Sequence, residues 1–246
     1  GLLTTEHGKK DMRIWVDVDW SKMPGNKKMT GTITFQGGGK QIVVKIQAIK
    51  PDIPALSNYG GFIENNGFRS IRATHFTSGL RRAGFHWNLI DGLGYKGSVL
   101  QALPEKINSE LSTYSDSIKR KNSFVEYDFY TFSSTSPEIT IFTLPTHPLN
   151  NNYSMRYAVS INDGPLKIVD FKTVGRSEEW KQNVLRNRAE KKITMPHLVA
   201  GKHKLKIYCI DPGVILDEIR IDLGGLKKAY SSVQETRINS TSQRAF

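Results

Sequence analysis

Hydrophobic and polar residues alternate in short runs along most of the chain, and a period of two is typical of β-strands. In residues 13–20 every second residue is apolar, which predicts a strand with one buried face. Residues 32–35 and 42–46 flank three consecutive glycines at 37–39 and predict a β-hairpin. Three strands are too few for an independent sandwich, so residues 1–50 are expected to form a small, partial β-domain.

Two prolines within residues 51–54 interrupt the alternation, and a linker is expected over residues 51–66. Further strand-like runs follow with Gly, Pro and Asn between them, which predicts an all-β sandwich or jelly roll over residues 67–238. The polar residues 239–246 are expected to form a flexible tail. The clearest runs lie at residues 70–76, 98–103, 124–132, 138–144, 155–161, 205–210 and 214–221.

Two segments have helical spacing instead. Apolar residues recur at the helical interval between Ile107 and Ile118, inside a polar stretch. Ser177 precedes two glutamates, and a serine N-cap with acidic residues in the first turn predicts a short helix there.

The chain of 246 residues carries 35 Lys and Arg against 23 Asp and Glu, a formal charge of +12. No basic cluster has the aromatic and glycine pattern of an RNA-binding sheet, so a solvated basic surface is expected and no nucleic-acid partner. No apolar run approaches the ~20 residues that a membrane span needs. The single cysteine, Cys209, lies in an apolar run and is expected to be a small buried hydrophobe.

Residues that mark enzyme chemistry form no recognisable pattern. The sequence has no phosphate-binding loop, no Gly-x-Ser-x-Gly elbow and no closely spaced histidine pair of a zinc hydrolase. No feature singles out two carboxylates for glycoside hydrolysis among Asp91, Glu126, Asp128, Asp211 and Asp217. No catalytic residue and no cofactor is therefore assigned.

The densest group of aromatic and short polar residues begins at Trp87 and continues through Asn88, Asp91 and Tyr95. A sugar presents apolar C–H faces and hydroxyl groups, so its site combines an aromatic platform with polar partners. Trp87 and Tyr95 are the candidate platform, and Asn88 and Asp91 are the candidate hydroxyl partners. The alternative is that Trp87 packs in the core and the neighbouring glycines only shape a turn.

Residues 70–77 (SIRATHFT), 87–94 (WNLIDGLG) and 211–217 (DPGVILD) occur in an order that resembles the C-terminal region of glycoside hydrolase family 115, the xylan α-glucuronidases. The resemblance continues at residues 144–146, 156–161 and 201–205. Residues 13–20 and 31–46 resemble the second half of the small β-domain that precedes this region in the family. That domain is of an immunoglobulin-like or BACON-like type.

This resemblance implies a jelly-roll β-sandwich of the galactose-binding-like type, similar to carbohydrate-binding modules of families 6 and 35. It also implies that the catalytic machinery lies in other domains, so the chain is expected not to be an enzyme. Related modules hold a structural calcium with two glutamates where this chain has Arg72 and Thr74, and only Asp217 remains as a candidate metal ligand. We expect Arg72 to pair with Asp217 and replace the metal; the alternative is that Arg72 points into solvent.

The expected function is therefore a non-catalytic sugar-binding module for a plant-type polysaccharide such as glucuronoxylan, accessory to the catalytic domains of a glycoside hydrolase. The positive charge would favour a uronate-bearing glycan. Alternatives are a structural or docking domain, or a dissected C-terminal piece of a family 115 α-glucuronidase without its own ligand. The expected location is the bacterial periplasm, the extracellular space or the cell surface.

Overall fold

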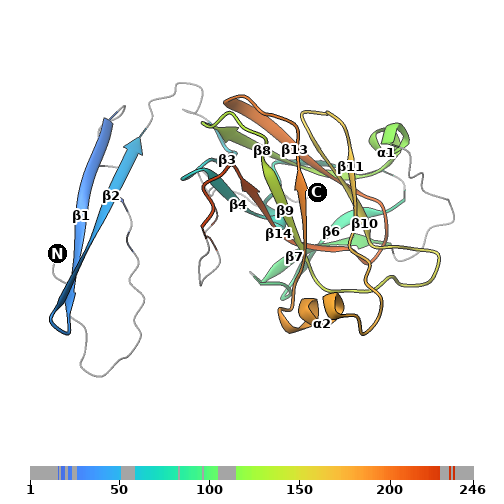
Figure 1. The fold of residues 1–246 in the computed structure, drawn as a ribbon. Coiled ribbons are helices and arrows are strands. Elements are labelled where there is room, and N and C mark those ends of the chain that lie inside the picture. Colours follow the sequence, from blue (N-terminus) through green and yellow to red (C-terminus); the bar gives the residue numbers. More distant parts are fainter. Residues whose placement is uncertain are drawn as a thin grey trace. The chain divides into compact units, whose positions relative to one another are not determined.

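The computed structural model describes residues 16, 18–19, 22–23, 27–50, 59–82, 84–95, 97–104, 115–227, 233 and 235. The chain divides into two compact units, Gly1–Tyr59 and Gly60–Phe246 (Figure 1). Of the strand predicted over residues 13–20, only residues 16, 18 and 19 are described, and none of them is in a strand. The predicted tail at 239–246 lies outside the described residues.

The first unit contains an antiparallel ribbon of β1 (Lys27–Gly37) and β2 (Lys40–Lys50), so the predicted hairpin is confirmed. Its turn consists of Gly38 and Gly39, with φ of 56° and 72°. Two successive positive φ values suit the type I′ turn, whose twist matches that of the flanking strands. This turn therefore depends on glycine.

The ribbon buries little apolar surface. Ile42 is 63% exposed and Met29 is 52% exposed, although both have the alternation of a half-buried strand. Two strands alone cannot cover one another's apolar face, and a single hairpin is marginally stable in water. Besides the ribbon, the described part of this unit includes Met23, which is 4% exposed and lines a pocket with Met29, Ile46 and Ala48, so the buried apolar surface of this unit is small.

The second unit is a β-sandwich of two sheets with six strands each, which confirms the predicted fold class. In sheet 1 the order is β11-β10-β13-β8-β3, and β5 also pairs with β8. Its strands are β3 (Phe62–Ile63), β5 (Ser78–Leu80), β8 (Phe124–Thr131), β10 (Arg156–Ile161), β11 (Lys167–Asp170) and β13 (Gly201–Cys209).

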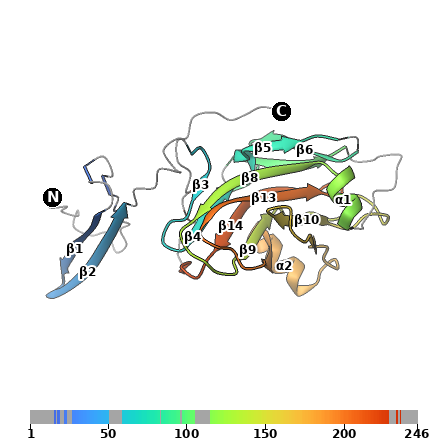
Figure 2. The same cartoon turned by 90° about the horizontal axis from the view of Figure 1, so that it is seen from above.

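In sheet 2 the order is β12-β9-β14-β7-β6, and β4 also pairs with β14. Its strands are β4 (Phe68–Arg72), β6 (His86–Asp91), β7 (Ser98–Leu103), β9 (Glu138–Thr143), β12 (Ala189–Thr194) and β14 (Ile215–Asp222). Figures 1 and 2 show the two sheets as stacked layers of one sandwich.

The core lies between the sheets and follows the period of two along each strand. In β8 the side chains of Val125, Tyr127 and Phe129 are fully buried, and β14 contributes Ile219 and Ile221. The Tyr127 hydroxyl donates a hydrogen bond of 2.6 Å to the carbonyl of Ala73, which satisfies its polar atom inside the core. The alternate side chains of these strands lie on the outer faces of the sheets, where two smaller buried clusters also occur.

Two short helices lie at separate places on the sandwich (Figure 2): α1 (Ser115–Lys121) and α2 (Glu178–Leu185). In α1, Ile118 is fully buried against the outer face of sheet 1, together with Ala158 and Tyr208. The helix predicted between 107 and 118 is described only from residue 115 onward. The second predicted helix is confirmed, because the Ser177 hydroxyl accepts a hydrogen bond of 3.2 Å from the Trp180 N–H.

Two boundaries differ from those predicted. Phe62–Ile63 pairs with β8, so residues 62–66 belong to the sandwich and the linker predicted over 51–66 is too long. The strand predicted over residues 70–76 ends at Arg72 and continues as a 3-10 turn, Ala73–His75. The N–H of Arg72, the last residue of β4, donates to the Glu235 carboxylate at 2.8 Å.

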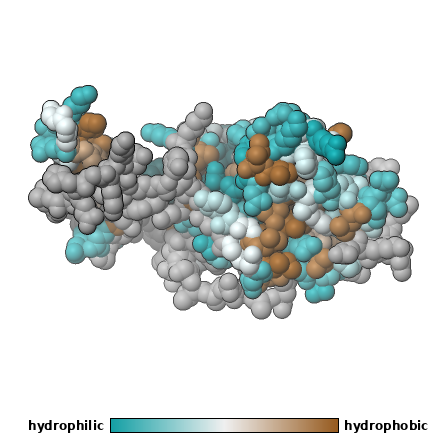
Figure 3. Space-filling model, turned by 90° about the horizontal axis from the view of Figure 1, so that it is seen from below, coloured by the Kyte–Doolittle hydropathy of each residue, from teal (hydrophilic) through white to brown (hydrophobic). Residues whose placement is uncertain are grey.

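Figure 3 shows one face of the molecule, on which apolar patches are interrupted by hydrophilic side chains. Exposed apolar residues on the sandwich include Leu185 and Val184 of α2. Among the described residues, no helix is long and apolar enough to cross a membrane.

Candidate functional site

Trp87 lies in the core between the sheets. Its side chain is 2% exposed, and its indole N–H donates a hydrogen bond of 3.1 Å to the carbonyl of Ile207 in β13. On the same inner face of sheet 2, Trp87 is directly opposite the buried Ala102 of β7. The prediction that Trp87 forms a sugar platform is therefore wrong, because a ligand cannot reach its ring, and the alternative of a core tryptophan is confirmed.

Asn88 and Asp91 lie on opposite faces of β6, because residues three apart in a strand point to opposite sides. Asn88 is opposite Gln101 on the outer face, whereas Asp91 is opposite Ser98 and shares the face of Trp87. Asp91 is exposed because it ends an edge strand, and Asn88 is half-buried. The structure does not bring these two side chains together as joint hydroxyl partners.

Tyr95 lies in the turn between β6 and β7, and its side chain is 62% exposed. The turn is closed by a hydrogen bond of 2.8 Å from the Gly92 N–H to the Gly97 carbonyl. The Tyr95 N–H lies 3.2 Å from Oδ1 and 3.3 Å from Oδ2 of Asp217. Gly94 permits this approach, because it has φ of +80° and a Cβ there would lie 2.7 Å from Asp217 Oδ1. Tyr95 thus keeps an exposed ring on an anchored backbone.

Asp217 pairs with Arg188 and not with Arg72. Its side chain is 2% exposed, and its Oδ2 lies 3.4 Å from Nη2 of Arg188. The pairing of β4 with β14 places Arg72 opposite Glu218, and no Arg72–Asp217 ion pair is present among the described residues. The predicted Arg72–Asp217 pair is therefore wrong. The reason is register: Arg72 stands beside Glu218 in the ladder, one residue further along β14 than Asp217.

The residues around Asp217 do not suit calcium. This ion takes six to eight oxygen ligands, most of them carboxylate or carbonyl oxygens. Both Asp217 oxygens already receive the Tyr95 N–H, and a guanidinium stands where further ligands would be needed. Within the described ranges, no group of three or more His, Cys, Asp or Glu side chains could hold a metal ion.

The outer face of sheet 2 carries a cluster of arginine and aromatic side chains, which we call the arginine face: Tyr95, Phe142, Arg188, Asp217, Glu218 and Arg220. The Arg188 guanidinium carbon lies 3.9 Å from the centre of the Phe142 ring and 5.3 Å from that of Tyr95. The Arg220 guanidinium carbon lies 4.6 Å from the centre of the Phe142 ring. A guanidinium attracted to two rings is held in place by cation–π interaction.

Glu218 links the two arginines of this face. Its Oε2 lies 2.5 Å from Nη2 of Arg188, its Oε1 lies 2.6 Å from Nε of Arg220, and the Ser70 hydroxyl donates to Oε1 at 3.1 Å. The carboxylate is 2% exposed. Burial by itself would raise the pKa of Glu218, but the hydrogen bond and charge of Arg220, together with Arg188, hold this pKa below its ordinary value. Glu218 is therefore an ionised buried anchor for both guanidinium groups.

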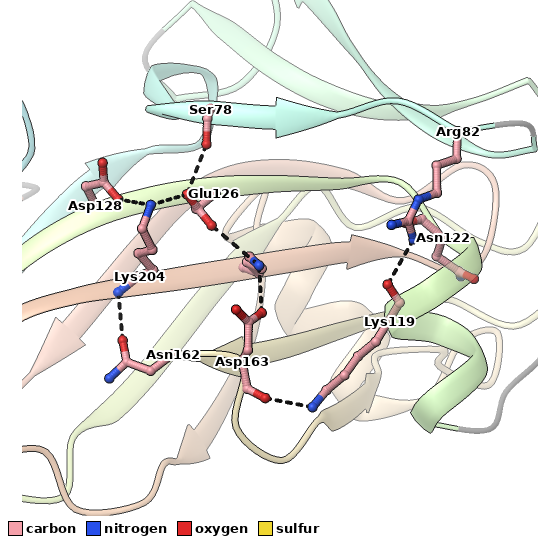
Figure 4. A network of polar contacts seen from close by, with 10 residues as sticks. Ser78, Arg82, Lys119, Asn122, Glu126, Asp128, Asn162, Asp163 and Lys204 are labelled. Carbon is pink, nitrogen blue, oxygen red and sulfur yellow. Dashed lines mark hydrogen bonds and ion pairs between the residues drawn. The ribbon is translucent and has the colours of Figure 1, made fainter.

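The outer face of sheet 1 carries a different network, which Figure 4 shows. The Nζ atom of Lys204 in β13 lies 2.5 Å from Glu126 Oε1 and 2.9 Å from Asp128 Oδ1. Lys206 lies 2.6 Å from Asp163 Oδ1 and 3.6 Å from Glu126 Oε2. We call this group the lysine face.

Hydrogen bonds within the lysine face shift the pKa values of both kinds of partner. Burial alone would raise the pKa of Glu126, but hydrogen bonds from Lys204 and Ser78 lower it. The hydrogen bond to Glu126 raises the pKa of Lys204. Three carboxylates surround two ammonium groups, so this face has no surplus positive charge to offer a ligand.

Sequence reasoning missed Phe142, Arg188 and Arg220 as site residues. One signal was available: alternation in β14 places Glu218 and Arg220 on the outer face because Ile219 and Ile221 fill the core. The approach of Arg188 had no such signal, because Arg188 precedes β12 and reaches β14 across β9.

Known proteins resemble this chain to differing degrees. The family model of the glycosyl hydrolase family 115 C-terminal domain matches residues 61–235. A search of curated proteins gives no match. A solved family 115 4-O-methyl-α-glucuronidase with specificity for decorated arabinogalactans is 27% identical, with a TM-score of 0.48, over 71% of this chain and 19% of that enzyme.

Two carbohydrate-binding modules are similar at lower identity. The C-terminal family 6 module of a laminarinase from Zobellia galactanivorans has 13% identity and a TM-score of 0.40, over 63% of this chain and 98% of that module. A family 35 module from Clostridium thermocellum has 15% identity and a TM-score of 0.40, over 62% of this chain and 97% of that module. With a match from residue 61 to 235, the chain belongs to the glycosyl hydrolase family 115 C-terminal domain family.

Proposed function

We propose that this chain is a non-catalytic saccharide-binding module that accompanies the catalytic domains of a glycoside hydrolase and binds a plant-type polysaccharide such as glucuronoxylan. The observation that carries this proposal is the exposed ring of Tyr95 on an anchored turn, directly beside guanidinium donors. An aromatic face next to polar donors suits the C–H face and hydroxyl groups of a sugar ring.

An anchored aromatic ring such as that of Tyr95 suits ligand binding better than an exposed ring without such contacts. Its backbone N–H is held by Asp217, and the Arg188 guanidinium lies over its ring. A side chain that is already ordered loses less conformational entropy when a ligand lands on it. Asn88 stands on the same outer face of sheet 2 and is the remaining candidate for a hydroxyl contact, whereas Asp91 points to the other side of its strand.

The proposed location follows from the proposed ligand. A plant-type polysaccharide meets a bacterial protein in the periplasm, in the medium or at the cell surface, and we place the module there. The solved family 115 enzyme acts on decorated arabinogalactans, so arabinogalactan is the second ligand to test.

Isothermal titration of the purified chain with xylo-oligosaccharides, glucuronoxylan and arabinogalactan tests the proposal. We expect Tyr95→Ala to weaken binding about tenfold, since an aromatic contact contributes ~1 kcal/mol beyond its buried area. Phe132→Ala is the matched control, because Phe132 is a 37% exposed aromatic residue directly after β8. Equal losses in both variants would contradict a site at Tyr95.

The purified wild-type chain is expected to release no uronic acid from an aldouronic oligosaccharide. A folded chain that binds none of these saccharides would refute the proposal and favour the structural or docking role. The exposed apolar side chains of the ribbon, such as Ile42, are the feature that such a docking role would use.

A further inference from the structure

Arg188 and Arg220 use only part of their hydrogen-bonding capacity. A guanidinium has five N–H donors and no acceptor. Among the described residues, the Arg188 side chain makes hydrogen bonds only through Nη2, to Asp217 and Glu218, and the Arg220 side chain only through Nε, to Glu218. The remaining donors are Nε and Nη1 of Arg188 and both Nη atoms of Arg220.

These donors are in contact with solvent. The side chains of Arg188 and Arg220 are 17% and 19% exposed. None of their nitrogen atoms belongs to the buried polar atoms that lack a hydrogen-bond partner within the described part of the chain. The guanidinium groups are thus buried on the side of Glu218 and open on the other.

Contacts on the buried side fix the orientation of the Arg188 and Arg220 guanidinium groups. Glu218 receives one donor of each arginine, and the Phe142 ring, 3% exposed, lies under both guanidinium carbons at 3.9 Å and 4.6 Å. Donors that are already oriented bind an anion at a lower entropic cost than flexible lysines do.

Neighbouring outward carboxylates already have partners of their own. Glu138 lies 2.8 Å from Lys192, and Glu190 lies 3.6 Å from Arg186. Glu235 is occupied by the His75 ring nitrogen at 2.7 Å. These carboxylates therefore do not compete for the open donors of Arg188 and Arg220 in the described structure.

We propose that Arg188 and Arg220 form a carboxylate subsite of the arginine face, which selects saccharides that carry a uronic acid next to the ring that stacks on Tyr95. This inference rests on the proposed saccharide-binding function and adds to it the two residues that bind the carboxylate of the ligand. The planar fork of a guanidinium matches the two oxygens of a carboxylate, and hydrogen bonds between two charged groups are about twice as strong as neutral ones. Sulfate and phosphate groups carry the same charge chemistry without the planar match.

Calorimetric titration with a matched pair of ligands tests the subsite: xylotetraose, and xylotriose that carries one 4-O-methylglucuronic acid. Wild-type protein should bind the acidic ligand about tenfold more tightly, and this preference should shrink as NaCl is raised. Arg220→Gln should abolish most of the preference, and Arg220→Lys should restore only part of it, because lysine keeps the charge and loses the fork. Thermal melting establishes that each variant is folded.

Lys204→Met is the matched control, because it removes an equal charge from the lysine face. It should leave the preference for the acidic ligand in place. Equal loss in Lys204→Met and Arg220→Gln would mean that only net charge matters, and this result would overturn the subsite.

The outcomes separate this inference from the function on which it rests. Equal binding of both ligands by wild-type protein would overturn the carboxylate subsite and leave saccharide binding intact. Binding of neither ligand, nor of any polysaccharide, would overturn the proposed function. A competition experiment compares sodium sulfate with sodium glucuronate as displacers of the acidic ligand. Equal displacement by the two salts would overturn the preference for a planar carboxylate.

Discussion

The lysine face and the arginine face, on opposite sides of the sandwich, use their charged side chains differently. On the lysine face, Lys204 and Lys206 lie among Glu126, Asp128 and Asp163 (Figure 4). On the arginine face, Arg188 and Arg220 share Glu218 and rest on Phe142. The first face satisfies its cations with its own carboxylates, whereas the second leaves donors open to water.

The difference follows from side-chain chemistry. An ammonium group is a compact charge that one or two carboxylates can surround, and Lys204 has two within 2.9 Å. A guanidinium spreads its donors around a planar group, so that one edge can be anchored while another stays free. The net charge of +12 therefore does not locate an anion site in this chain. The anion site is located instead by the type of cationic side chain and by the contacts that anchor it.

The largest expected effect comes from breaking the core that both faces share. Trp87→Ala removes a 2% exposed indole and leaves the Ile207 carbonyl without its hydrogen bond. We expect a loss of ~3–5 kcal/mol in the free energy of unfolding, measured by urea denaturation. Leu89→Ala is the control on the same strand, because Leu89 is 44% exposed and should cost far less. A stable Trp87→Ala protein that has lost only binding would contradict the core assignment.

The next effect comes from removing the anchor of the arginine face. Glu218→Gln leaves Arg188 and Arg220 without their shared charge, and we expect a loss of ~3 kcal/mol at neutral pH. The lowered pKa of Glu218 determines how its contribution to the free energy of unfolding depends on pH. Its contribution is complete above the ordinary pKa of a glutamate, about 4.3, and disappears as the pH falls through the lowered folded-state pKa.

Denaturation at several pH values checks this prediction as a difference between wild type and variant. The difference is needed because the pKa values of Glu126 and Asp170 are also lowered and contribute to the wild-type profile. Glu190→Gln is the control, since the Glu190 side chain is 40% exposed and pairs with Arg186 at 3.6 Å. A stability gap between wild type and Glu218→Gln that does not narrow as the pH falls below the ordinary pKa of a glutamate would refute the anchor role.

A smaller effect is expected on the lysine face. The Lys204 side chain is 54% exposed, and exposed ion pairs contribute ~0–1 kcal/mol. Lys204→Met should therefore shift the free energy of unfolding by less than ~1 kcal/mol, with addition of 1 M NaCl to the wild type having a comparably small effect. A loss as large as that of Glu218→Gln would remove the distinction between the faces.

The smallest effect is expected from metal ions. Arg188 already supplies the positive charge beside Asp217, and a bound Ca²⁺ would add like-charge repulsion. Melting temperatures in EDTA and in millimolar Ca²⁺ should therefore agree. A clear rise in Ca²⁺ would contradict the replacement of the metal by a guanidinium at this position.

Much of the sandwich could be predicted from the sequence because a period of two fixes which side of a strand is buried. The run that includes Val125, Tyr127 and Phe129 alternates cleanly and forms β8. Alternation failed for the ribbon, where Ile42 has the same pattern and stays exposed because burial needs an opposing layer. Local pattern gives a strand its faces and does not say whether anything covers them.

The site was harder to predict because it depends on contacts between distant segments. Proximity in sequence pairs Trp87 with Tyr95, but Trp87 faces the core and Tyr95 faces the solvent. A family pattern pairs Arg72 with Asp217, whereas the register places Arg72 beside Glu218. Arg188 meets Tyr95 only because several strands fold between them, and no local spacing encodes that contact.

The most direct test of the central claim, that ligand binds at Tyr95 on the arginine face, is a ¹H–¹⁵N NMR titration of the chain with the glucuronic acid-substituted xylotriose. The account predicts chemical-shift changes at the Tyr95 N–H and at the guanidinium Nε–H signals of Arg188 and Arg220. The backbone signals of Lys204 and Lys206 on the lysine face should stay in place. Shifts concentrated on the lysine face, with Tyr95 and both arginines unperturbed, would contradict it.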